Sequence, residues 1–203
     1  MNMTVRMGTL LLNVLLVQVL SLTVGYPTGA PSSACEDMMP RHGVQPQPSP
    51  APYSIQTSNR TFQPGQPVTV TINGPDYAGV LLEARMESTA SALGTWQSLP
   101  TNTQFLHCSG NQKSAITHSN TNVKDNSTVY SWMPPSGISS IYFMATVAQQ
   151  RTVFWLNVKS DTLTKGVGTG ADGSPSGVNP VLWAKAGPLC MVPSLIFTFM
   201  CSR

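Results

Sequence analysis

Short segments in which apolar and polar residues alternate recur between turn residues from residue 52 to residue 159. In the clearest case, residues 67–73, the apolar side chains of Val68, Val70 and Ile72 alternate with threonines. A Pro-Gly pair precedes this segment and Asn-Gly-Pro follows it, and these residues are typical of turns. Since successive side chains of a strand point to opposite faces, the pattern predicts a half-buried β-strand between two turns.

Comparable apolar segments predict further strands in the same part of the chain. They cover residues 53–57, 80–86, 105–108, 114–118, 128–133, 141–148 and 152–158. No segment predicts a helix, because even residues 82–93, which contain helix formers, lack a cap and a sustained 3.6-residue period. The sequence therefore predicts an all-β fold, an antiparallel β-sandwich of seven to eight strands.

The inward faces of these strands supply the expected core. Residues 152–158 carry apolar side chains on both faces, which predicts a central strand. Trp96 falls in the polar stretch 88–103, where we expect an exposed loop. The predicted core residues are Val68, Val70, Ile72, Leu82, Trp132, Tyr142, Met144, Val153 and Trp155.

Composition excludes two broad classes of protein. Charged residues make up 9% of the 203 residues, against about 25% in an average soluble domain, whereas the hydrophobic share of 41% is ordinary. Intrinsic disorder requires low hydrophobicity and high charge. With a net charge of +3 and no cluster of lysines and arginines, the chain also lacks the features of a nucleic-acid-binding protein.

The N-terminus predicts export from the cell. Arg6 precedes a mostly apolar run, residues 10–22, and Gly25 supplies a small residue just before Tyr26. This arrangement is typical of a signal peptide, residues 1–25, cleaved before Tyr26. The alternative is an uncleaved anchor, but the run is shorter than the ~20 residues that span a bilayer. We expect a secreted, extracellular protein.

Export permits glycosylation and disulfide bonds. Asn-X-Ser/Thr sequons at Asn59 and Asn126 both precede predicted strands, so we expect them to be glycosylated in exposed loops. Cys35, Cys108, Cys190 and Cys201 allow three pairings. Cys190 and Cys201 could pair with each other or remain free.

The C-terminal part divides into a Gly/Ser-rich linker, residues 166–177, and an apolar tail, residues 178–203. Three interpretations of the tail remain open: it is poorly ordered, it packs on the domain, or it is a signal for a GPI anchor attached near Gly173-Ser174. The last would place the protein at the cell surface.

The sequence supports no catalytic, metal or cofactor site. The cysteine and histidine spacings do not fit zinc, and His42, His107 and His118 are far apart in the sequence. There is no Gly-X-Ser-X-Gly motif and no phosphate-binding glycine loop. The adjacent carboxylates Glu36 and Asp37 are better explained as a solvated acidic spot than as an acid/base pair.

Several motifs nevertheless occur in an order that resembles the reeler (reelin) domain, over about residues 35–159. In chain order they are Cys35-Glu-Asp-Met-Met-Pro40-Arg-His42-Gly43, Pro52-Tyr53, Pro64-Gly65, Tyr77-Ala-Gly79-Val-Leu-Leu-Glu-Ala-Arg85, His107-Cys108, Thr117-His118-Ser119-Asn120, Lys124 and Trp132-Met-Pro134-Pro135. The resemblance implies a reeler domain, placed here at residues 26–165, with an immunoglobulin-like sandwich and a Cys35–Cys108 disulfide that tethers the N-terminal segment.

Members of that family include secreted defence proteins, ferric-chelate reductase-like proteins and reelin. The resemblance implies a secreted, non-catalytic binding module in innate defence, with microbial surface glycans or lipids as partners and no cofactor. Two alternatives remain open: a truncated relative of the reductases that lacks the haem domains, or an extracellular matrix or adhesion module.

Overall fold

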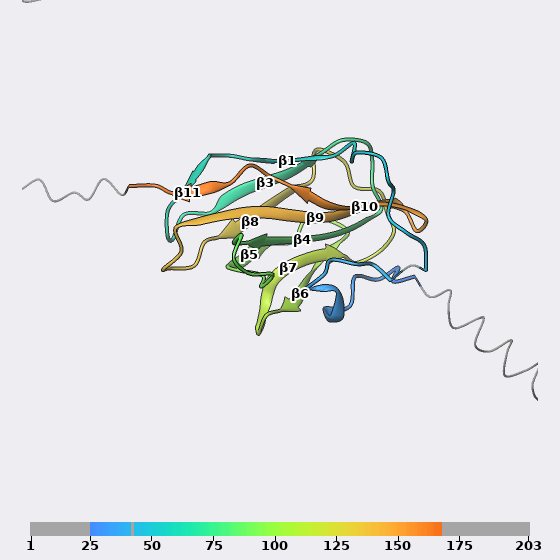
Figure 1. Ribbon diagram of the computed structural model, residues 1–203, viewed down its shortest axis with the longest axis horizontal. Helices are drawn as coiled ribbons and strands as arrows, with labels where there is room; N and C mark the ends of the chain where they lie inside the picture. The colour runs from blue at the N-terminus through green and yellow to red at the C-terminus, as the bar shows by residue number, and fades with distance from the viewer. Residues whose placement is uncertain (1–24, 42, 168–203) are drawn as a thin grey trace, which may run out of the picture. The chain divides into compact units, whose positions relative to one another are not determined.

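Two β-sheets stack face to face in the computed structural model, which describes residues 25–41 and 43–167 (Figure 1). The smaller sheet has the strand order β1-β3-β8-β5, with every pair antiparallel. Its strands are β1 (Ser54–Thr57), β3 (Val68–Asn73), β8 (Val129–Met133) and β5 (Thr95–Ser98). In the described part of the chain the one helical element is a 3-10 turn, η1 (Ser32–Ala34).

The larger sheet has the order β2-β11-β9-β4-β7-β6, with β10 also paired to β9. Its strands are β2 (Thr61–Phe62), β11 (Leu163–Lys165), β9 (Ser140–Gln150), β4 (Gly79–Arg85), β7 (Asn111–His118), β6 (Thr103–Cys108) and β10 (Val153–Lys159). These pairs are antiparallel except β2 with β11, which is parallel. The predicted all-β sandwich is confirmed, with the short strands β2, β5 and β11 in addition to those predicted.

An aromatic cluster fills the centre between the sheets. The Phe143 ring lies 5.3 Å from the Trp132 ring and 5.8 Å from the Trp96 ring, measured between centroids. Both indole N–H groups are satisfied, since Trp96 donates to the Ser114 carbonyl and Trp132 to the Leu93 carbonyl. The predicted inward face of β3 is confirmed, because its two valines and Ile72 are buried. Strand alternation therefore identifies the inner face of β3 correctly.

The exposed position expected for Trp96 is wrong. Trp96 lies in β5 and is fully buried against Tyr130 and Phe143. Polar neighbours concealed a strand of four residues in which Trp96 is the one apolar side chain. Its face could only be recognised once β5 had paired with β8.

The central position expected for residues 152–158 is also wrong, because β10 pairs with β9 alone. The segment that precedes β1 runs along the other edge of β10, where the Gln47 N–H donates to the Phe154 carbonyl over 2.9 Å. Both faces are apolar for a different reason, an irregularity at Asn157, where φ is +57°. It brings Trp155 and Val158 into the same core cluster although they are three residues apart.

A second apolar cluster lies on the outer face of the larger sheet. Tyr142 and Met144 of β9 belong to it, so their prediction as residues of the main core is wrong. They pack with Ala34 and Met38 of the N-terminal segment, defined here as residues 25–41. Strands β4 and β9 are consequently buried on both faces, since the smaller sheet covers one and this segment covers the other.

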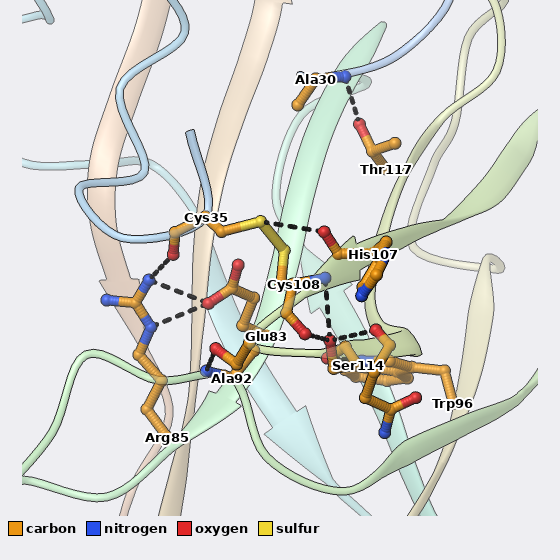
Figure 2. The surroundings of a disulfide bond; sticks show 12 residues. Ala30, Cys35, Glu83, Arg85, Ala92, Trp96, His107, Cys108, Ser114 and Thr117 are labelled. Atoms are coloured by element: carbon orange, nitrogen blue, oxygen red, sulfur yellow. Dashed lines mark hydrogen bonds and ion pairs between the residues drawn. A yellow bond between two sulfur atoms is a disulfide. The ribbon is translucent and has the colours of Figure 1, made fainter. Parts of the chain in front are cut away.

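The Cys35–Cys108 disulfide attaches the N-terminal segment to β6, with the two Cα atoms 5.6 Å apart (Figure 2). This confirms the bond implied by the family resemblance. Beside it the Arg85 guanidinium bonds the Cys35 carbonyl and lies 2.8 Å from Glu83 Oε2. Glu83 is fully buried, and its Oε1 has no hydrogen-bond partner among the described residues. Burial raises the pKa of Glu83 to about 7, although the positive charge of Arg85 opposes the rise.

The aromatic centre predicts a large cost for truncating Phe143. The substitution Phe143→Ala should lower the free energy of unfolding by about 3–5 kcal/mol, because it opens a cavity between two tryptophans. Urea denaturation followed by tryptophan fluorescence measures this. Val129→Ala, at an exposed position of β8, is the control and should cost less than about 1 kcal/mol. Equal effects of the two substitutions would contradict the assigned core.

The buried carboxyl predicts a pH-dependent stability. Because the pKa of Glu83 is near 4.5 when unfolded and about 7 when folded, the folded state binds its proton more tightly. The resulting stabilisation is present below pH 4.5 and is lost as the pH rises through about 7, a change of about 3 kcal/mol. Glu83→Gln removes this titration.

Unfolding by urea at pH 4.5, 6 and 8 tests the titration. Relative to the parent, the Glu83→Gln variant should gain stability as the pH rises over this range, whatever constant offset the substitution adds. Glu87→Gln, at an exposed position near the end of β4, is the control and should show no such trend. A stability difference between parent and Glu83→Gln that stays constant with pH would refute the assignment.

Candidate ligand-binding site

A cavity of about 690 Å³ opens between the N-terminal segment and the outer face of the larger sheet. The segment contributes residues between Gly25 and Pro40, and the sheet contributes the beginning of β4 and the end of β9. The lining residues are Gly25, Tyr26, Pro27, Ala30, Ala34, Met38, Pro40, Ala78, Gly79, Val80, Leu81, His118, Thr121, Thr146, Ala148, Gln149, Gln150 and Arg151.

Small side chains on the sheet leave this space unfilled. Gly79 of β4 lies directly opposite Ala148 of β9 in the antiparallel register. A Cβ atom at position 79 would lie only 3.2 Å from the Ala148 Cβ, so this glycine allows the two strands to approach closely. Ala30 and Ala34 face the same space from the N-terminal segment. Both walls of the cavity therefore include small residues that leave space between them.

Hydrogen bonds hold the N-terminal segment over the cavity at points separate from the disulfide. The Ala30 N–H donates to Thr117 Oγ1 over 2.9 Å (Figure 2). Thr146 Oγ1 donates to the Met38 carbonyl over 2.7 Å. His118 Nε2 donates to the Tyr26 carbonyl over 2.7 Å. The segment is thus fixed to β7 and β9 as well as to β6.

Lys124 fixes the wall of the cavity at the beginning of β4. Its side chain is buried, and Nζ donates to the carbonyls of Ala78 and Asn122, each over 2.8 Å. Burial lowers the pKa of Lys124 to about 8. The ammonium group joins the loop before β8 to the residue next to Gly79, and this loop contributes Thr121 to the lining.

The chemistry of the lining suits binding better than catalysis. It contains one arginine and one histidine and no carboxylate. His118 already bonds the Tyr26 carbonyl through Nε2, and its Nδ1 lies 3.3 Å from the Val80 N–H. General acid–base catalysis requires a titratable group that reaches the substrate. Here the histidine holds two segments of the protein together.

The other candidate residues from the sequence are not brought together in the described structure. His107 is exposed on β6, whereas His118 lies at the end of β7 in the cavity lining. Among the described residues, the group with metal-ligand spacing is Cys35, Glu83 and Cys108, and its two sulfurs are bonded to each other. A sulfur in a disulfide is not the thiolate that binds metals.

Exposed positions carry the remaining predicted features. Asn59 follows β1 and Asn126 lies in the turn before β8, both exposed, and their glycosylation stays a prediction. Glu36 and Asp37 are exposed as expected, and Asp37 pairs with Arg41 at 2.8 Å.

His42 lies outside the described residues, as do residues 1–24 of the predicted signal peptide and residues 168–203, with Cys190 and Cys201. Within 25–41 and 43–167, no helix has the length and apolar character needed to cross a membrane.

Sequence reasoning did not identify the cavity. Its small residues come from the N-terminal segment, β4 and β9, and no local sequence pattern connects them. The one available signal was the histidine in Thr117-His118, at the end of an otherwise apolar strand. In the structure that histidine contacts Tyr26 of the N-terminal segment, 92 residues away in the chain.

Comparison with known proteins agrees with this fold. The family description "Reeler domain" matches residues 33–170. "Putative defense protein 3" of Antheraea mylitta is 38% identical over 157 residues, which cover 74% of this chain and 93% of that protein. Ferric-chelate reductase 1 of Bos taurus is 34% identical over 149 residues, 71% of this chain but only 25% of the reductase. The chain thus corresponds to about a quarter of that relative.

Among solved structures, the human F-spondin reeler domain is similar, with a TM-score of 0.49 and 19% identity. The alignment covers 61% of this chain and 95% of that domain. The match to residues 33–170 and the identity to the Antheraea mylitta protein establish the family independently of this likeness. The chain belongs to the reeler domain family.

Proposed function

We propose that this protein is a secreted, non-catalytic binding module that recognises microbial surfaces in innate defence. The observation that carries the proposal is the cavity beneath the N-terminal segment. Its volume of about 690 Å³ falls within the range of about 300–1,000 Å³ typical of ligand sites. Such sites are largely apolar with a few polar groups, and this lining has the same character.

The arrangement of charged groups supports binding without catalysis. The buried pair of Glu83 and Arg85 is not part of the cavity lining, so its perturbed carboxyl does not face the space where a ligand would lie. Lys124 donates its hydrogens to backbone carbonyls of the protein. The strongly shifted groups near the cavity therefore have structural partners.

The relatives support a role in defence. The defence protein of Antheraea mylitta is matched over 93% of its length, so nearly all of it corresponds to this chain. The bovine reductase is matched over only 25% of its length, and reduction is therefore not carried over to this chain. The predicted signal peptide, the disulfide and the two exposed sequons support an extracellular location.

Binding to defined surface components tests the proposal. The protein, expressed from the full sequence in eukaryotic cells and purified, is titrated with lipopolysaccharide, lipoteichoic acid and peptidoglycan. Phosphatidylcholine vesicles provide the comparison. We expect saturable binding to at least one microbial component, at least about tenfold tighter than to the vesicles, a difference of about 1.4 kcal/mol. Equal or unsaturable binding to all four would refute the proposed function.

A further inference from the structure

We propose that the cavity holds one acyl chain of an anionic amphiphile, with the acidic head group at Arg151. This assignment rests on the proposed binding function and specifies its ligand. It is drawn from three features of the lining: its hydrocarbon surface, the internal use of its polar groups, and its charge.

Hydrocarbon surface dominates the walls. An acyl chain forms no hydrogen bonds and is stabilised in proportion to the apolar area it buries, with a gain of about fourfold in affinity for each methylene. A space with mostly aliphatic walls therefore suits such a chain. The aliphatic residues are Ala30, Ala34, Met38, Leu81 and Ala148.

Two polar side chains of the lining are already bonded within the protein. Thr146 Oγ1 donates to the Met38 carbonyl, and His118 Nε2 donates to the Tyr26 carbonyl. A sugar in this space would require several donors and acceptors, since a buried hydroxyl without partners is costly. The interior therefore favours a hydrocarbon over a glycan.

The one cationic side chain at the edge of the cavity indicates where the acidic head group would bind. Arg151 lies in the turn between β9 and β10, exposed, and is the one arginine or lysine in a lining without carboxylates. A guanidinium binds carboxylate or phosphate oxygens in bidentate geometry. The Arg151 side chain lies against Gly25, since its Cδ is 3.3 Å from where a Cβ of that residue would be. The predicted cleavage before Tyr26 would remove Gly25 and leave the new terminal ammonium group on Tyr26, another residue of the lining.

Three probes test the assignment by isothermal titration of the protein expressed from the full sequence. Dodecanoate should bind with a stoichiometry of one. Octanoate, four methylenes shorter, should bind about 250-fold more weakly, because hydrocarbon burial drives the binding. Dodecanol, with the same chain and no charge, should bind at least about tenfold more weakly than dodecanoate.

Two substitutions connect binding to the cavity. Ala148→Leu places a larger side chain in the space and should weaken dodecanoate binding at least about tenfold while the unfolding midpoint is retained. Ser98→Leu, which adds the same side chain on exposed β5, is the matched control and should leave binding unchanged. Arg151→Gln should reduce the affinity for dodecanoate to that for dodecanol. If Ala148→Leu does not fold, Ala30→Leu fills the cavity from the other wall.

The outcomes separate this assignment from the proposed function. Dodecanoate binding that is independent of chain length, or undiminished in a folded cavity-filling variant, overturns the acyl site. If microbial lipids bind equally to the parent and to that variant, the defence function stands and the acyl site is wrong. If dodecanoate binds in the cavity but no microbial component binds, the acyl site stands and the defence function is wrong. Loss of lipopolysaccharide binding after its acyl chains are removed would support both.

Discussion

The covalent bond between Cys35 and Cys108 holds the N-terminal segment against the outer face of the larger sheet. Closing a loop with a sequence separation of 73 stabilises the fold by about 4 kcal/mol in the chain-entropy model. The bond also brings the apolar side chains of Ala34 and Met38 onto Tyr142 and Met144. A sandwich normally has outer faces in contact with water, but here β4 and β9 are buried on both faces.

This cover explains the buried charges next to the disulfide. Glu83 and Arg85 alternate with the core residues of β4, so on an uncovered sheet their side chains would face water. Under the segment they pair with each other, and Arg85 also binds the carbonyl of Cys35. Removing a charged carboxylate from water is costly, and this cost raises the pKa of Glu83 in the region that the disulfide closes.

The same segment also creates the proposed binding site. Near the disulfide its side chains fill the space against the sheet, whereas toward Tyr26 the small residues on both walls leave it open. The hydrogen bonds with Thr117, His118 and Thr146 hold the segment in place over this open space. An apolar ligand would therefore enter a preformed cavity and order little protein on binding, which favours affinity.

The sequence by itself determined the strand class and the inward face of β3, because a period of two is a local property of the chain. The disulfide was predictable through the family resemblance, since four cysteines alone allow three pairings. Tertiary structure alone decided that Trp96 is buried, that Tyr142 and Met144 face the N-terminal segment, and that β9 is the one strand that pairs with β10 among the described residues. It also brought His118 and Arg151 to one cavity. The physical reason is that alternation shows which side chains share a face, whereas burial of that face depends on a segment distant in the chain.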